Sequence, residues 1–252
     1  MDSDSETIRR YHEQGYLILR NFLSEMDLKA IEAEIDRISR LNVSRFAEGH
    51  LFFAKTTQII QQIEHLEQYS RFFADMMRTD RHILDVVKSI FDAEAISNNV
   101  SFMAKPAHVG EVVPYHQDNA YYGYVPDDAL SVWIALDDST QENGCLRVIP
   151  GSHKKGLVRH ATTGVRGISF GVADPVEPKR DGEIAVTLNR GDTSLHHCGT
   201  FHASSSNRSN RSRRGLILFY HSAKCRVDDT LLRDYHSARD DMVAVSSDEP
   251  DT

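Results

Sequence analysis

The residues with the clearest chemical potential lie in the stretch VPYHQDNAYY, residues 113–122, which contains His116 and Asp118 two positions apart. If this stretch is an extended strand, both side chains point to one face, about 7 Å apart, and can bind the same ion. With 13 His and 37 Asp plus Glu in 252 residues, a His-x-Asp triplet also arises by chance. The triplet therefore predicts a metal site only if a third ligand joins it.

We expect that third ligand in the His-rich stretch after the turn Asn189–Asp192, where His196, His197 and His202 follow one another. We select His202, because it precedes a polar, basic segment that leads into the apolar run GLILFYHS. A His at the end of such a strand is well placed to line the mouth of a pocket. The histidines of the N-terminal part lie among polar residues of predicted helices, where a surface position is the ordinary interpretation.

Two imidazoles and one carboxylate form the facial triad of non-haem Fe(II) oxygenases, which leaves three coordination positions open. Zinc accepts similar ligands, so these residue types alone do not decide the metal. Arg213, eleven residues after His202, favours iron. A guanidinium binds a carboxylate through two parallel hydrogen bonds, as the far end of a dicarboxylic 2-oxo acid requires. Taken alone, the basic run around Arg213 is more often a solvated turn.

Helices are predicted in the N-terminal part. The segment 22–41 carries apolar residues at helical spacing, and Ser24 with Asp27 is typical of an N-cap followed by an acidic first turn. Two more helices are expected over residues 58–78 and 80–92, the second capped by Asp80. These helices must pack against whatever core the rest of the chain forms.

From about residue 95 the pattern changes to short β-like runs separated by turn residues. The runs are SVWIALDD (131–138), CLRVIPG (145–151), EIAVTLNRGD (183–192) and GLILFYHS (215–222). Short strands without helices between them predict an antiparallel sandwich or barrel, so the fold class is mainly β with flanking helices. Residues 152–182 lack periodicity and are expected to form a long functional loop, such as a lid.

The composition limits the function further. The net charge of −8 argues against a nucleic-acid binder, and no apolar run is long enough to predict a membrane span. Three widely spaced Cys and a polar, acidic N-terminus predict a cytoplasmic protein without a signal peptide or disulfide framework. The acidic residues 237–252 are expected to be a disordered tail, and the sequence indicates no oligomeric state.

The chain resembles the phytanoyl-CoA dioxygenase family of Fe(II)- and 2-oxoglutarate-dependent oxygenases. The resemblance is carried by YHQD at 115–118, VWIALDDSTQENGCLRVIPGSHKKG at 132–156, and LNRGDTSLHHCGTFHASSSNRSNRSRRG at 188–215. The opening, YHEQGYLILRNFLSEMDLKAI, is similar to that family's helix–strand–helix entry. The resemblance implies one oxygenase domain over 1–236. Its double-stranded β-helix core, a jelly-roll relative, over about 96–225 would pack against a helical part over about 1–95.

The resemblance also implies Fe(II), 2-oxoglutarate and O₂ as reactants, with hydroxylation of a small metabolite and release of succinate and CO₂. The implied iron ligands are His116, Asp118 and His202. The implied 2-oxoglutarate contacts are Arg213, Ser204, Gln117, Trp133, Lys55 and Ser101. Candidates for contact with a small-molecule substrate are Asn99, Tyr121, Tyr122, Tyr124 and Arg166.

The chain departs from the family pattern in one place: His202-Ala-Ser-Ser stands where the family commonly has His-Gly-Ser-Gly. It also lacks a peroxisomal address, so a fatty acyl-CoA substrate is not implied. The acidic ligand Asp118 argues against halogenation. Two alternatives stay open: a zinc-dependent cupin-like enzyme at the same ligands, and a non-catalytic protein that binds a small acid.

Overall fold

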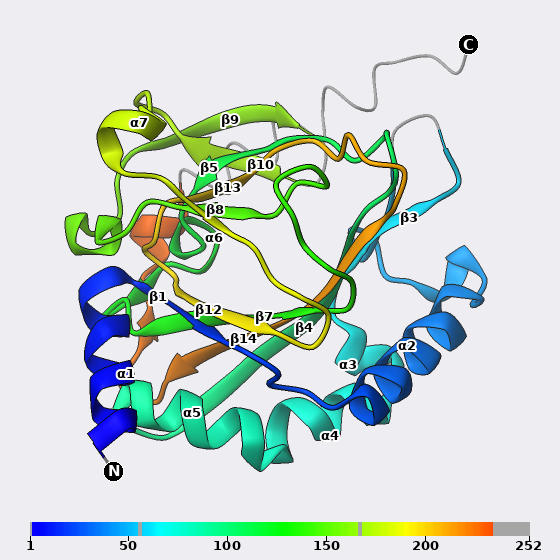
Figure 1. Cartoon of the computed structure of the whole chain (residues 1–252), viewed down its shortest axis with the longest axis horizontal. Coiled ribbons are helices and arrows are strands. Elements are labelled where there is room, and N and C mark those ends of the chain that lie inside the picture. Colours follow the sequence, from blue (N-terminus) through cyan, green and yellow to red (C-terminus); the bar gives the residue numbers. More distant parts are fainter. Residues whose placement is uncertain (1, 55–56, 166–167, 234–252) are drawn as a thin grey trace.

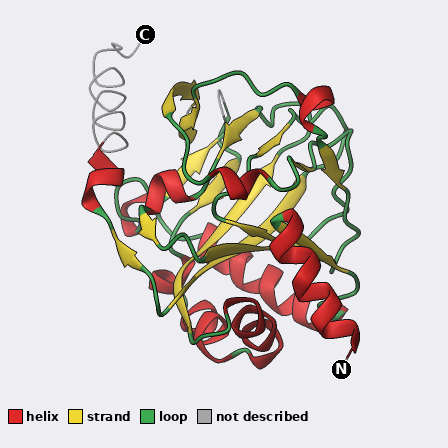
Figure 2. Cartoon of the chain, turned by 90° about the vertical axis from the view of Figure 1, so that its left-hand side faces the viewer, coloured by secondary structure: helices red, strands yellow, loops and turns green. Residues whose placement is uncertain are grey.

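The computed structural model describes residues 2–54, 57–165 and 168–233. Figure 1 shows two antiparallel sheets that face each other, with helices packed below the larger one. Figure 2 shows from the side that the helices cover the outer face of the larger sheet and leave its other face to the smaller sheet. This arrangement is the predicted jelly-roll core with N-terminal helices, so the fold class is confirmed.

The larger sheet forms the floor of the barrel. Within the described residues its seven strands follow the spatial order β1 (Tyr16–Leu19), β12 (Thr193–His197), β7 (Ala129–Ala135), β14 (Arg213–Ser222), β4 (Ala95–Lys105), β3 (Ile60–Ile63) and β2 (Leu51–Phe53). Its centre therefore comes from strands far apart in the sequence. The predicted strands at 131–138 and 215–222 correspond to β7 and β14.

The smaller sheet lies opposite. Its strands are β11 (Ile184–Val186), β8 (Leu146–Val148), β13 (His202–Ser204) and β5 (Val113–His116). Beside β5 lies the hairpin of β9 (His160–Val165) and β10 (Ile168–Val172). A further short pair joins β6 (Tyr124–Val125) to β15 (Arg226–Val227). The smaller sheet carries the residues on which the metal hypothesis rests.

In the described part of the chain, four longer helices pack around the larger sheet: α1 (Asp2–Gln14), α2 (Glu25–Ser39), α4 (Arg71–Thr79) and α5 (Arg81–Phe91). The predicted caps are confirmed: Ser24 and Asp27 form a capping box at α2, and Asp80 caps α5. Short helical turns are η1 (Val43–Arg45), α3 (Leu66–Tyr69), α6 (Asn119–Tyr122), η2 (Ser152–Lys155) and α7 (Pro178–Asp181). Among the described helices, none is both long and apolar enough to cross a bilayer.

The prediction of one helix over 58–78 is wrong. Residues 60–63 form β3, which pairs with β4, and α3 and α4 follow as separate helices. The apolar residues at helical spacing misled the prediction, since Ile63 packs in the core from a strand. His65 adopts a left-handed conformation with φ of 56°, and Ser70 caps α4 anew, so no single helix continues through this segment.

Residues 152–182 also hold more regular structure than predicted, namely η2, the β9–β10 hairpin and α7. A lid function for this segment stays a prediction. The acidic tail 237–252 lies outside the described residues.

Alternation along the strands gives the larger sheet two different faces. On β7, Val132 and Ile134 pack with Leu28 and Phe73 in the main core, on the helix side. Trp133 points the other way and packs against Val148 of the smaller sheet. The inner face can therefore carry polar side chains for a site while the outer face supplies the apolar packing.

Candidate active site

Two sheet strands bring the three predicted ligands together. His116 ends β5 and His202 begins β13, and the two residues are register partners in the smaller sheet. Asp118 follows at the start of α6, with its Oδ1 at 3.3 Å from His202 Nε2 and 3.6 Å from His116 Nε2. One ligand atom from each of the three lies within 4.8 Å of the others, so one ion can be held among them.

Backbone carbonyls fix both imidazole rings in the orientation that a metal ligand needs. His116 Nδ1 lies 2.9 Å from the carbonyl oxygen of Pro114, and His202 Nδ1 lies 2.9 Å from that of Thr200. Because a carbonyl only accepts, the Nδ1 atoms must carry the donated hydrogens. The Nε2 atoms then face Asp118 and remain as the metal-binding atoms, while the hydrogen bond at Nδ1 keeps each ring in its orientation.

Asp118 is held by two residues that the sequence analysis did not select. Its other oxygen, Oδ2, accepts a hydrogen bond from Ser131 Oγ at 2.7 Å and lies 3.3 Å from His196 Nε2. Ser131 and His196 are register partners on β7 and β12, on the inner face of the larger sheet. The signal available was the alternation in TSLHH, which places Ser194 and His196 on one face of a buried strand.

Burial and mutual charge set the protonation of the three residues. Burial, with the positive charge of His202, lowers the pKa of His116 to about 3. Burial opposes charge on His202 and Asp118, but their attraction outweighs it: the pKa of His202 is raised, and that of Asp118 is well below its ordinary value. Without metal, Asp118 and His202 form an ion pair, whereas His116 is neutral.

Arg213 lies deeper in the barrel, buried at 3% exposure. Its Nη2 donates to the carbonyl of Gly144 at 2.8 Å, and its guanidinium lies 5.1 Å from the centroid of the Trp133 ring. A Cβ on Gly215 would come within 2.4 Å of that ring, so glycine lets Trp133 lie against β14. No described carboxylate forms an ion pair with Arg213, whose Nε has no partner, and burial lowers its pKa to about 10.

Lys105 is a second buried basic side chain, which the sequence analysis missed. It is the register partner of Arg213, and its Nζ donates to the carbonyls of Glu111 and Ser205 at 2.5 and 2.7 Å. Burial and the charge of Arg213 lower the pKa of Lys105 to about 6, while the carbonyl oxygens favour the ammonium form. This end of the barrel therefore attracts anions.

The other described residues predicted to contact 2-oxoglutarate lie in different parts of the fold. Ser204 and Ser101 are buried, on β13 two residues after His202 and on β4 respectively. The amide of Gln117 makes three hydrogen bonds to backbone atoms of Gly156, Val158 and Gly199, so it fastens the loop beside His116. Contact of any of these residues with 2-oxoglutarate stays a prediction.

The residues predicted to contact the substrate do not all lie next to one another. Tyr122 OH donates to Asn99 Oδ1 at 3.3 Å, and the ring of Tyr121 lies edge-on to His116 at 6.0 Å between centroids. Tyr124 packs in an aromatic cluster with Phe219. Lys55 and Arg166 lie outside the described residues.

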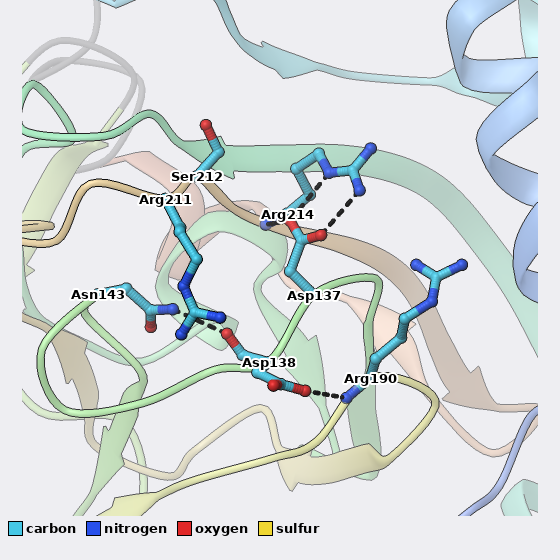
Figure 3. Close-up of a pocket in the computed structure, with 7 residues that line it drawn as sticks. All are labelled: Asp137, Asp138, Asn143, Arg190, Arg211, Ser212 and Arg214. Carbon is cyan, nitrogen blue, oxygen red and sulfur yellow. Dashed lines mark hydrogen bonds and ion pairs between the residues drawn. The ribbon is translucent and has the colours of Figure 1, made fainter.

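A surface pocket of about 600 Å³ lies elsewhere, on the outer side of the barrel. Figure 3 shows Arg190, Arg211 and Arg214 around Asp137 and Asp138 in this pocket. Arg214 follows Arg213 on β14, so its side chain points away from the barrel interior. None of the predicted site residues lines this pocket.

Solved structures of similar fold belong to one class of enzyme. The chain matches EctD from S. alaskensis with 2-oxoglutarate and 5-hydroxyectoine at a TM-score of 0.74, with 20% identity over 89% of this chain and 78% of that one. It matches EvdO2 from Micromonospora carbonacea var. aurantiaca complexed with 2-oxoglutarate at 0.70, with 21% identity over 88% and 92%. These identities show the shared fold. A jelly roll with such a ligand cluster is typical of the non-haem Fe(II)/2-oxoglutarate oxygenases.

The family follows from the sequence comparison. The family model described as phytanoyl-CoA dioxygenase (PhyH) matches residues 11–215. A phytanoyl-CoA dioxygenase of Arabidopsis thaliana is 29% identical over 82% of this chain and 85% of its own length. A probable alpha-ketoglutarate-dependent hypophosphite dioxygenase of Stutzerimonas stutzeri is 29% identical over 87% and 79%. The chain belongs to the phytanoyl-CoA dioxygenase family and is an Fe(II)/2-oxoglutarate-dependent dioxygenase, as its motifs predicted.

Proposed function

We propose that this enzyme hydroxylates an unactivated C–H bond of a small metabolite. His116, Asp118 and His202 would bind the iron, and Arg213 would bind the far carboxylate of 2-oxoglutarate. The observation that carries the proposal is the buried Arg213 guanidinium, which has no carboxylate partner among the described residues.

A buried cation without a counter-ion costs several kcal/mol, which a bound carboxylate recovers through two charge-assisted hydrogen bonds. Trp133 supports one side of the guanidinium, and Lys105 lies beside it on the neighbouring strand, where a bound anion would favour the ammonium form of the lysine. This end of the barrel is therefore suited to a dicarboxylate that reaches toward the ligand cluster.

The donor set also fits iron. Both His rings offer Nε2, and Ser131 and His196 hold Asp118 Oδ2 so that Oδ1 faces the imidazoles. A carboxylate held in this way binds through one oxygen, which leaves coordination positions for 2-oxoglutarate and O₂.

When bound, iron and 2-oxoglutarate supply the oxidising power: R–H, O₂ and 2-oxoglutarate yield R–OH, succinate and CO₂. The chain's own part is to bind and orient the reactants and to exclude water from them. Gln117 contributes by fixing the loop that follows β5, which keeps His116 and Asp118 in place.

The test is succinate formation in air with Fe(II) and 2-oxoglutarate, first alone and then with candidate substrates. Asp118→Ala and His202→Ala are expected to lose succinate formation by at least about 1,000-fold while keeping the wild-type circular dichroism spectrum. Asp174→Ala removes an exposed carboxylate of the β10–α7 loop and serves as the control. Full turnover in either ligand variant would contradict the assignment.

The same assay separates the alternatives that the sequence left open. A zinc-dependent enzyme would release no succinate, whether Fe(II) or zinc is supplied. A non-catalytic binding protein would bind Fe(II) and 2-oxoglutarate without consuming them.

A further inference from the structure

A second polar cluster lies where β3 meets β4. It consists of Gln62, Glu64, Asn99, Ser101 and Tyr122 and is named the Glu64 cluster. Glu64 Oε1 accepts a hydrogen bond from the Gln62 amide. Glu64 Oε2 accepts hydrogen bonds from the Ser101 hydroxyl and, at 3.2 Å, from Asn99 Nδ2. One carboxylate therefore organises a largely buried set of neutral donors.

The register places this cluster inside the barrel. Asn99 lies in one cross-strand row with Ser131, which holds Asp118, and Ser101 lies in one row with Trp133. Only β14 separates β4 from β7, so the two strands are about 10 Å apart at the usual strand spacing. The Glu64 carboxylate, bonded to both Asn99 and Ser101, thus lies on the same inner surface as the proposed iron ligands, within the length of a small metabolite.

The charge of Glu64 has no cationic partner among the described residues. Its hydrogen-bond donors are two amides and a hydroxyl, and no described Lys or Arg forms an ion pair with it. Burial and neighbouring His65 lower the pKa of His50, so this nearby ring is neutral near pH 7. Neighbouring Glu67 differs, since its carboxylate pairs with His65 and accepts the Val100 N–H.

Aromatic residues lie next to the cluster, and Tyr122 joins it through its hydroxyl group, which donates to Asn99 Oδ1. The ring of Tyr122 stacks on Phe219 with centroids 4.0 Å apart, and Tyr124 lies 5.9 Å from Tyr122 in near-parallel orientation. A carboxylate without a cationic partner binds organic ammonium groups by ion pairing, and aromatic rings nearby add to the attraction for such groups.

We propose that Glu64 binds a positively charged nitrogen of the substrate, so that the enzyme oxidises a small organic amine or ammonium compound. The proposal rests on the hydroxylase function proposed above and names its substrate class. The substrate would lie between the iron ligands and Glu64, its charged nitrogen on the β4 side, about 10 Å or two strand spacings from β7, whose Ser131 holds Asp118. Arg213 and Glu64 thereby divide the inner surface into an anion-binding and a cation-binding part.

The experiment measures succinate release by the iron-loaded enzyme with a panel of matched compounds. Each small amine, amino acid or quaternary ammonium compound is paired with an uncharged or anionic compound of the same carbon skeleton, for example choline with 3,3-dimethylbutanol. We expect the compounds that stimulate succinate release to come from the cationic half. Glu64→Gln keeps the size of the side chain and is expected to raise the concentration for half-maximal stimulation about tenfold or more. Glu67→Gln changes a carboxylate three residues away, on α3, and is expected to leave it unchanged.

The outcomes separate this proposal from the hydroxylase function. If the wild type releases no succinate from 2-oxoglutarate under any condition, the hydroxylase proposal itself fails. If it does release succinate, the role of Glu64 is contradicted by equal stimulation from the uncharged partners, by stimulation from no cationic compound, or by equal response in Glu64→Gln. Should Glu64→Gln fail to fold, the charge preference of the wild-type panel still decides.

Discussion

Two regions of the molecule are built around arginine, and they treat its charge in opposite ways. In the surface pocket of Figure 3, Arg214 pairs with Asp137 and Glu32, and Arg190 pairs with Glu25 and Glu32. Inside the barrel, Arg213 contacts a carbonyl oxygen and an aromatic ring and pairs with no carboxylate of the described residues. Arg213 and Arg214 are neighbours on one strand, and their side chains differ in face and in partners.

The difference indicates where a ligand is needed. The surface arginines tie α2 to the strand ends of the larger sheet and have their charge neutralised by the protein itself. The charge of the interior guanidinium would be neutralised by a bound anion. Cavity size is a poor guide in this molecule, because Arg190 and Arg214 in the open surface pocket are already paired with carboxylates, whereas Arg213 in the barrel has no carboxylate partner among the described residues.

The comparison is tested most strongly by removing each arginine in turn. Arg213→Ala is expected to raise the 2-oxoglutarate concentration for half-saturation at least about 30-fold, since loss of one partner of a buried charged pair costs ~2–5 kcal/mol. Fe(II) affinity should change little, because the ligands remain. Titration with 2-oxoglutarate under anaerobic conditions measures both. An unchanged requirement for 2-oxoglutarate would remove Arg213 from this role.

Change of pH should affect the barrel interior and leave the surface pocket unaltered between about pH 6 and 8, where Arg, Asp and Glu keep their charges. Metal must displace the proton that Asp118 and His202 share, so Fe(II) affinity is expected to fall about tenfold per pH unit below the raised pKa of His202. The stability of the metal-free protein is expected to show the opposite trend. The His202–Asp118 pair stabilises the fold fully below the unfolded pKa of His, and this stabilisation is lost as pH rises through the folded pKa.

Calorimetric Fe(II) binding and urea unfolding of the metal-free protein, both between pH 6 and 8, check these trends. Parallel rather than opposite trends would contradict the ion pair.

The smallest effect is expected from Arg214→Ala. This arginine is about one-third exposed, so its ion pairs contribute only ~1 kcal/mol to the free energy of unfolding and weaken as salt is added. The 2-oxoglutarate requirement should equal that of the wild type. Urea unfolding at low and high salt measures the first effect, and succinate assays measure the second. A larger effect of Arg214→Ala than of Arg213→Ala on 2-oxoglutarate binding would reverse the comparison.

The sequence was most informative where the chemistry is local. The two-residue spacing of His116 and Asp118 and the position of His202 before a basic turn predicted side chains that the fold brings together. Ser131, His196 and Lys105 were not predicted, because their contacts depend on how strands distant in the sequence are paired: Ser131 and His196 hold Asp118, and Lys105 lies beside Arg213. The helix expected over 58–78 failed for the same reason, since pairing of β3 with β4 overrides the apolar spacing.

Arg213 shows both what the sequence predicts and what it leaves open. Its position predicted an anion-binding role, but the sequence alone left open a solvated turn for the basic run around it. Only the pleat of β14, with Gly215 making room for Trp133, separates the inward from the outward arginine. Glu64 was passed over because it lies in a segment read as helix.

The most direct test of the central claim is the visible charge-transfer absorption that forms when Fe(II) and 2-oxoglutarate bind together without oxygen. We predict that the band appears in the wild type only when both are present, saturates at one iron per chain, and is absent from Asp118→Ala. Absence of the band from the wild type, or an unchanged band in Asp118→Ala, would contradict the convergence of His116, Asp118 and His202 on one iron.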